Sequence, residues 1–392
     1  MKKLLLFLSI LMFLQCKTST GKQGAGDLAE IDISQNYPER EMYLQDIAQV
    51  EYIPLETNDN LLLGNTANIV YVSDNYIIVR NMREGDVFVF DGQGKSKFSF
   101  NNKGQSGTEY FVIYSMAFDE KAKEIYIADR FSASPKFLVY AEDGKFKRSF
   151  PFPADFLPRD MYSFDDETLL VYDEFGMSTD NYSNKPYMLI SKKDGSIVES
   201  LDIFLSDRVS NRISIPIEVD GQPGIMPLTI SIPNNRSDGK NFLIADWSSD
   251  TIYRFTPRKE LLPVIIRNPS VQKNEPKIVI SNELVCDKFI FLSKAVFDFE
   301  MAKRSRTIPS SNLVYDFKTG QLNEYKLINK DYESRGVGFI TSITPANTGV
   351  YTIDVPQLFE ANDAGNVKGA LKQLLKTLDE DDNPVLVKVK FF

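Results

Sequence analysis

The chain has 392 residues, of which 43% are hydrophobic and 12% aromatic, and its formal net charge is −9 at pH 7. This composition suits an all-β fold of half-buried strands, and the acidic charge argues against a nucleic-acid partner because it provides no basic field for phosphates. The chain contains no histidine, which excludes Ser-His-Asp, Cys-His and zinc-histidine chemistry but leaves carboxylate catalysis and oxygen-ligated calcium open.

The N-terminal segment has the pattern of a secretory signal peptide. Lys2 and Lys3 precede the apolar run from Leu4 to Leu14, which has the length of a signal sequence and is too short to span a bilayer comfortably. Cys16 follows this run and resembles the lipobox cysteine of bacterial lipoproteins. We therefore expect residues 1–16 to be a lipoprotein signal peptide and Cys16 to be lipidated. Ordinary signal cleavage at another position is the alternative.

Residues 17–44 are expected to form a flexible tether between the lipid anchor and the folded domain. The stretch from Lys17 to Gly26 is polar and rich in Gly, Ser and Thr, and it has no apolar face that could pack. Such a tether would hold the domain off the membrane.

Beyond the tether, the sequence repeats a unit of short strand-like runs separated by turn residues. Val87–Phe90, Phe137–Tyr140 and Tyr187–Ile190 are copies of one run, and an Asp-Gly turn follows each within a few residues. Asp-Gly between apolar runs is a strong hairpin signal, because the favoured turn needs positive φ angles. Later copies, such as Thr251–Phe255, are more divergent. A repeat of roughly 40 to 55 residues with four strands per unit predicts an all-β, six-bladed β-propeller of four-stranded blades.

The C-terminal part interrupts the strand pattern once. Between Gln357 and Leu378 the leucines follow helical spacing with charges between them, which predicts one amphipathic helix inserted before the last strand. That last strand is expected at Val385–Phe391. Pairing it with the early run Val50–Leu55 would close the ring and hide two sheet edges. We therefore expect residues 45–392 to form a single propeller domain.

Several stretches resemble a known family. The spacing within Phe118–Asp129 and the segment Leu378–Leu386 resemble the six-bladed β-propeller lipoproteins of Bacteroidetes, which are related to NHL-repeat propellers. Members usually carry a Gly-x-Gly-Pro-Gly-Glu-Tyr turn after the first blade. Lys103–Tyr110 keeps two glycines, the glutamate and the tyrosine of this turn but lacks the proline. The resemblance implies a secreted or envelope-bound binding module, and we include Tyr110 of this turn among the candidate binding residues.

Further candidates for ligand binding lie beside strongly apolar strands, where propellers usually meet their ligands at the mouth of the central channel. They are Arg80, Asp129, Arg130, Asp246, Trp247 and Arg335. Arginine and tryptophan are common anchors of binding surfaces, since the arginine fork grips carboxylates and tryptophan buries a large area. These residues could form one rim. Alternatively, the aspartates cap turns, the arginines pair with neighbouring carboxylates, and the tryptophan packs between blades.

Three other features receive structural interpretations. Arg208–Asn235 contains four prolines and is interpreted as a long insertion that could overhang one face, or else as two ordinary strands of the fourth blade. The acidic run Asp379–Asp382 lacks the ligand spacing of a calcium loop and is expected to be a solvated helix end. Cys286 lies in a strand-like run and is expected to be buried and inert.

Two functions are compatible with the sequence. The first is a non-catalytic binding or scaffolding module, anchored in the envelope, that recognises a protein, peptide or glycan at its channel mouth. The second is a calcium-dependent propeller hydrolase or lyase acting on a sugar lactone or similar small substrate. No catalytic residue, metal ligand or cofactor is assigned. A periplasmic location is preferred over the cell surface, because the residues after Cys16 lack an acidic export tag.

Overall fold

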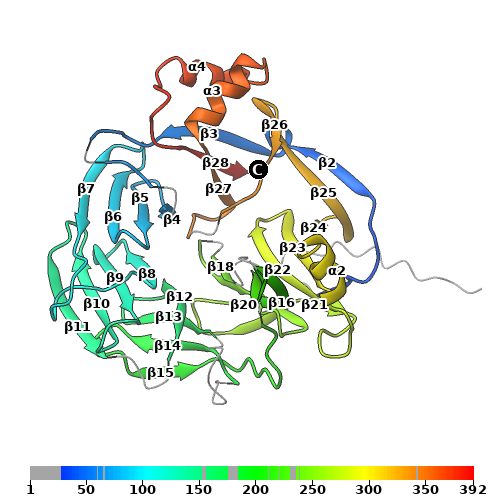
Figure 1. Cartoon of the computed structure of the whole chain (residues 1–392), viewed down its shortest axis with the longest axis horizontal. Helices are drawn as coiled ribbons and strands as arrows, with labels where there is room; N and C mark the ends of the chain where they lie inside the picture. Colours follow the sequence, from blue (N-terminus) through cyan, green and yellow to red (C-terminus); the bar gives the residue numbers. More distant parts are fainter. Residues whose placement is uncertain are drawn as a thin grey trace, which may run out of the picture.

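Six β-sheets are arranged around a central axis as a closed ring of blades (Figure 1). The computed structural model describes residues 28–392 except 60, 65–66, 152–155, 175–183, 211, 220, 230–234, 238 and 341–342. Consecutive blades along the chain are neighbours in the ring. The protein is a six-bladed β-propeller, which confirms the fold predicted from the repeated hairpins.

Blades 1 to 3 each consist of four antiparallel strands in sequence order, with the first strand nearest the axis. Blade 1 contains β4 (Ala67–Val72), β5 (Tyr76–Asn81), β6 (Asp86–Asp91) and β7 (Ser96–Asn101). Blade 2 contains β8 (Ser115–Asp119), β9 (Glu124–Asp129), β10 (Lys136–Ala141) and β11 (Phe146–Pro151). Blade 3 contains β12 (Pro158–Ser163), β13 (Thr168–Asp173), β14 (Tyr187–Ser191) and β15 (Ile197–Ser200). The three runs that the sequence repeats are the third strands of these blades.

Blades 4 and 5 have the same core of four strands and are extended by N-terminal strands. Blade 4 contains β18 (Asn235–Ser237), β19 (Phe242–Ile244), β20 (Thr251–Phe255) and β21 (Leu261–Asn268). Blade 5 contains β22 (Lys277–Val285), β23 (Phe289–Phe297), β24 (Ser310–Asp316) and β25 (Gln321–Asn329). The added strands are β1 (Ala29–Asp32), parallel to β21, and β2 (Glu39–Tyr43), parallel to β25. The short strand β26 (Tyr332–Gly336) also pairs with β25.

The prediction that the tether extends to residue 44 is wrong for residues 29–43. β1 alternates buried and exposed side chains, and Ala29 and Ile31 pack into the cluster between blades 4 and 5. In addition, β1 and β2 pair the outer edges of two blades that would otherwise present unpaired backbone groups. The polar stretch from which the tether was inferred, residues 17–26, lies outside the described residues, as do the predicted signal peptide and Cys16.

Blade 6 joins the two ends of the chain. Its strands are β27 (Thr348–Ile353), β28 (Val385–Phe391) and β3 (Ala48–Pro54), with the short helix α1 (Leu44–Ile47) before β3. β28 pairs antiparallel with β3 in a register that places Val385 opposite Pro54, so the predicted ring closure is confirmed. The inner position of this blade is occupied near Ile340, whose backbone N–H donates to Val350 O (2.9 Å).

Hydrophobic clusters fill all six interfaces between neighbouring blades. β9 shows how one strand serves two interfaces. Ile125 and Ile127 pack in the cluster shared with blade 1, whereas Tyr126 and Ala128 pack in the cluster shared with blade 3. Because successive side chains of a strand point to opposite faces and both faces are buried here, the second and third strands of a blade are nearly continuous apolar runs.

The predicted C-terminal helix is two short helices. They are α3 (Val355–Asp363) and α4 (Gly369–Leu375), and Gly365 between them has a φ of 79° that ends the first helix. Leu358, Leu371 and Leu375 are buried in the cluster between blades 5 and 6, so the leucine pattern does identify the packed face. No helix in the described part of the chain is long and apolar enough to cross a membrane.

The proline-containing stretch after blade 3 is an insertion. β16 (Arg212–Val219) and β17 (Gln222–Thr229) form a separate two-stranded sheet. Ile213 and Ile215 of this hairpin pack against Ala302 of helix α2 (Phe299–Ser305), which lies between β23 and β24. The alternative, that these residues are ordinary strands of blade 4, is wrong because β18 to β21 supply that blade.

Candidate functional site

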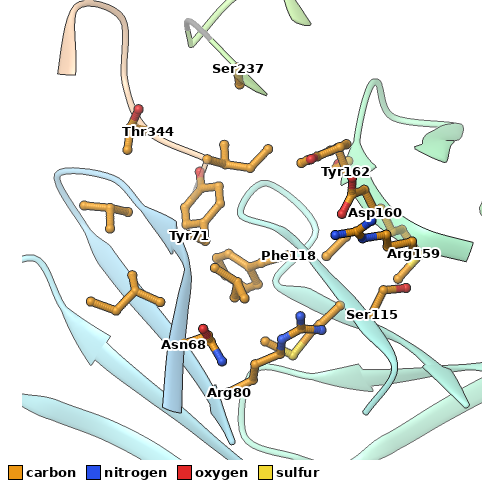
Figure 2. A pocket seen from close by; sticks show the side chains of 18 of the residues that line it. Asn68, Tyr71, Arg80, Ser115, Phe118, Arg159, Asp160, Tyr162, Ser237 and Thr344 are labelled. Atoms are coloured by element: carbon orange, nitrogen blue, oxygen red, sulfur yellow. The ribbon is translucent and has the colours of Figure 1, made fainter. Parts of the chain in front are cut away.

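A cavity of about 1240 Å³ lies along the axis of the ring. Its walls come mainly from the innermost strands β4, β8 and β12, together with residues of blade 4 and of the segment before β27. Figure 2 shows side chains of these strands converging on the cavity.

The two faces of the propeller carry different loops. Since strands alternate in direction, the links between blades and the loops after each second strand lie on one face of the propeller, which we call the linker face.

Arg80 lies near the linker-face end of β5 and lines the cavity. Its side chain is half-buried, and Nη1 donates to the backbone oxygen of Tyr114 (3.2 Å). Its buried Nε has no hydrogen-bond partner among the described residues. Burial lowers the pKa of the Arg80 guanidinium, and the negative charge of Asp160 opposes that effect. Because arginine remains protonated under such shifts, Arg80 presents a cation with an unused donor.

A second arginine in the wall is held by a carboxylate. Arg159 Nη1 donates to Glu174 Oε1 (2.7 Å), and the Tyr114 hydroxyl donates to Glu174 Oε2 (2.9 Å). Burial alone would lower the pKa of Arg159, but the charges of Asp160 and Glu174 outweigh it and raise the pKa. The arrangement fixes the guanidinium plane at the linker-face end of the cavity.

Irregular strand pairing helps to place these groups. In β12 the register shifts between Pro158 and Asp160, which makes Arg159 an extra residue relative to β13. Neighbouring residues of a regular strand point to opposite faces, but a bulge can turn a side chain toward a site. Arg159 and Asp160 both line the cavity, as do consecutive residues of the regular innermost strand β8. The register of β4 with β5 shifts in the same way just before Tyr71, and Tyr71 also lines the cavity.

Aromatic side chains form another part of the wall. The rings of Tyr71 and Phe118 meet edge to face at a centroid distance of 5.2 Å. The Tyr71 hydroxyl donates to Glu120 Oε2 (2.7 Å), and burial together with this hydrogen bond raises the pKa of Tyr71. Burial and the nearby Asp160 also raise the pKa of Tyr162, well above its usual range. These phenols therefore stay neutral and offer flat surfaces with a polar edge.

Of the predicted binding residues, Arg80 lines the cavity, whereas both predicted aspartates are hydrogen-bonded inside the protein. Asp129 Oδ1 accepts a hydrogen bond from Phe111 N (3.1 Å). Asp246 accepts from Ser248 N (2.8 Å) and from the Tyr187 hydroxyl (3.0 Å). Both carboxylates are buried. Asp246 thus caps its own turn, as the alternative interpretation has it, whereas Asp129 binds the link between blades 1 and 2.

Tyr110 and Trp247 are packing residues in this structure. Tyr110 is fully buried, and its hydroxyl donates to Gly85 O (2.6 Å) while accepting from Asn102 N (2.9 Å). Trp247 is buried with its ring 6.4 Å from that of Phe297. Arg130 follows β9 on the linker face, and its charge lowers the pKa of Asp173 against the larger effect of burial. The side chain of Arg335, in β26, lies outside what the structure describes.

The sequence interpretation missed residues on the innermost strands and in the segments next to them. These are Tyr114, Arg159, Asp160 and Tyr162, with Glu174 from the end of the neighbouring second strand. One signal could have revealed some of them. Arg159 and Asp160 are adjacent opposite charges just before the third copy of the repeat, and in a propeller the innermost strand can turn such charges toward a solvated channel. Cys286 is buried as expected, and burial raises the pKa of its thiol to about 11.

Fold and site together define a six-bladed β-propeller with an axial cavity lined by arginine and aromatic side chains. The chain belongs to the family described as a domain of unknown function, DUF4934, whose model matches residues 28–390. No curated protein matches it. Within the described residues, no group of three or more Cys, Asp or Glu side chains is placed to hold a metal ion.

Solved structures of Bacteroides proteins are similar to this chain. A protein of Bacteroides fragilis NCTC 9343 assigned as exported is 18% identical, with a TM-score of 0.64 over 93% of this chain and 100% of that one. A DUF4221 family member from Bacteroides vulgatus ATCC 8482 is 8% identical, with a TM-score of 0.46 over 88% of this chain and 97% of that one. At 18% identity, the similarity to the Bacteroides fragilis structure shows the propeller fold alone.

Proposed function

We propose that this protein is a non-catalytic binding protein of the cell envelope whose ligand occupies the axial cavity. The observation that carries the proposal is the cavity itself, whose 1240 Å³ slightly exceeds the roughly 300–1,000 Å³ of most small-molecule sites. Its wall combines cationic donors, tyrosine hydroxyls and aromatic rings, which is the mixture that binds a ligand through a few polar contacts and a larger packed surface.

Access from the linker face supports this proposal. Arg212 and Thr229, at the base of the inserted hairpin, belong to the cavity wall. The hairpin therefore begins and ends at the mouth and extends away from it, with Ile225 exposed near its far end. A peptide or glycan longer than the cavity could contact this hairpin while one end enters the channel. Besides a peptide or a glycan, the partner could be a protein that inserts a chain end into the channel.

The alternative of a calcium-dependent hydrolase or lyase receives less support from the chemistry of the wall. Arg80 and Arg159 place two guanidinium groups on the cavity, and like charges in a partly buried site repel a divalent cation. The carboxylate of Glu174 is already used by Arg159 and Tyr114. We therefore propose a binding site without calcium.

The proposed location is the periplasmic side of the envelope, with Cys16 as the lipid anchor. The similarity to an exported Bacteroides fragilis protein supports a location outside the cytoplasm, and the signal-like N-terminus agrees with it. We also propose that the protein is a lipoprotein and that it is related to the NHL-repeat propellers.

The proposal can be tested by blocking the cavity. Asn68 lines the cavity from β4 and is exposed to it, so Asn68→Trp would fill part of the space. Thermal melting of the full chain with a panel of short peptides, oligosaccharides and organic acids should reveal ligands that stabilise the wild type. The same ligands should fail to stabilise Asn68→Trp. Asn366→Trp, an exposed position between α3 and α4, is the matched control. Ligands that stabilise both variants equally would place binding elsewhere and contradict the proposal.

A further inference from the structure

The cavity wall carries an excess of positive charge in an otherwise acidic protein. Its basic residues are Arg80, Arg83, Arg159, Arg212 and Lys240, and its acidic residues are Glu120, Asp160 and Glu174. Five basic against three acidic residues give a formal charge of +2, whereas the whole chain carries −9. A concave site of one sign focuses the field and attracts the opposite charge.

Two of the three acids already accept hydrogen bonds from protein groups. Glu120 accepts hydrogen bonds from the Tyr71 hydroxyl (2.7 Å) and from Asn75 Nδ2 (2.8 Å). Glu174 accepts from Arg159 Nη1 (2.7 Å) and from the Tyr114 hydroxyl (2.9 Å). Each of these carboxylates thus uses both of its oxygens.

Two of the cations, Arg80 and Arg83, keep donors for a ligand. Arg80 donates from Nη1 to a backbone oxygen, and its buried Nε has no partner in the described part of the protein. A guanidinium has five N–H donors in a fixed fork. Arg83, two residues after the end of β5, is exposed and lines the same cavity. Arg80 is only half-buried, so the donors at the exposed tip of its guanidinium, rather than the buried Nε, are the ones that a ligand in the cavity can reach.

We propose that the cavity binds its ligand through a carboxylate, which Arg80 holds by charge-assisted hydrogen bonds while Arg83 attracts it at the rim. This inference rests on the function proposed above and specifies its ligand class. The apolar part of the ligand would pack against Phe118 and then Tyr71, which line the cavity above Arg80 in Figure 2. A carboxylate matches the guanidinium fork in geometry as well as in charge.

Such a carboxylate has two natural sources, a peptide C-terminus and a uronic acid. Matched pairs of probes distinguish them, namely N-acetyl-leucine against N-acetyl-leucinamide and glucuronate against glucose. Calorimetric titration of the full chain, at probe concentrations up to about 10 mM, covers the range of weak sites. One acid should bind at least about tenfold more tightly than its neutral counterpart, because the charge-assisted bonds are lost in the latter. The pair that shows the difference identifies the source.

Variants then assign the contact to Arg80. Arg80→Gln should weaken binding of the acid by about tenfold to a hundredfold. Arg258→Gln removes the same charge from an exposed turn of blade 4 and should leave binding unchanged. Arg83→Gln, at an exposed position that cannot disturb the core, should weaken binding by a few-fold and make it less sensitive to salt.

The outcomes separate this inference from the proposed function. If neither acid binds, if acid and neutral probe bind equally, or if Arg80→Gln binds as the wild type does, the carboxylate inference is overturned. Neutral ligands whose binding is blocked by Asn68→Trp would then still support a binding cavity. Acids that bind equally well to Asn68→Trp would overturn both.

Discussion

Replacing Lys192 by methionine is expected to destabilise the propeller strongly, because it leaves a buried carboxylate between blades 2 and 3 without its cation. Lys192 Nζ lies 2.5 Å from Asp119 Oδ2, and it also donates to Ser163 Oγ (2.9 Å) and to Asp165 O (2.5 Å). The two charged side chains are only 6% and 9% exposed. Breaking a buried pair by removing one partner costs about 3–5 kcal/mol.

A neighbouring pair provides a matched control. Lys121 Nζ lies at the same 2.5 Å from Asp166 Oδ2 and also joins blades 2 and 3, but its side chains are 77% and 70% exposed. Lys121→Met should therefore cost no more than about 1 kcal/mol. The double variant Lys192→Met with Asp119→Asn should recover a large part of the loss, since no unpaired charge remains buried.

Urea unfolding measures these differences, and the single buried Trp247 is a natural fluorescence probe. Midpoints and slopes for wild type and variants give the change in the free energy of unfolding. If Lys192→Met is within about 1 kcal/mol of Lys121→Met, burial does not determine the strength of this pair and the reasoning is refuted.

Two further predictions concern pH and calcium. Burial alone would raise the pKa of Glu124, but hydrogen bonds from Arg148, Lys147 and Tyr126 outweigh it and lower the pKa from 4.5 to about 2. Because the folded-state pKa is the lower one, this stabilisation is present above pH 4.5 and is lost as the pH falls toward about 2. Melting temperature measured against pH should fall less steeply over that window in Glu124→Gln than in the wild type. For calcium, we expect the melting temperature of the full chain to be the same with calcium and with EDTA, whereas a calcium-dependent rise that EDTA reverses would favour the hydrolase or lyase alternative.

The fold was predictable because its signals are local and repeated. A turn with a glycine recurs after the third strand in blades 1 to 3, and positive φ at Gly94, Gly144 and Gly195 shows why glycine is needed there. Ring closure followed from the need to pair two edges. The strands at residues 29–43 were missed because each is short, and their partners are more than two hundred residues away along the chain.

The site was only partly predictable because it depends on which side of a strand a residue faces. Arg80 and Asp129 both end or nearly end a second strand, but only Arg80 lines the cavity. Arg159 lies at a bulge in β12, and a register shift of one residue reverses the direction of a side chain. Bulges leave no clear mark in a single sequence, so the direction of such side chains required coordinates.

The distribution of buried surface explains why the residues that reveal this fold differ from those that form its site. The second and third strands of each blade have both faces in interfaces between blades, so their side chains are constrained by packing. The Asp-Gly turns follow the third strands and therefore lie on the face opposite the linker face. The cavity is instead lined by the innermost strands, the linker-face ends of second strands and the links between blades, which contribute Arg159, Arg80 and the inserted hairpin respectively. Differences in ligand among propellers of this architecture should accordingly arise at these positions, while the hairpin turns stay similar because the ring requires them.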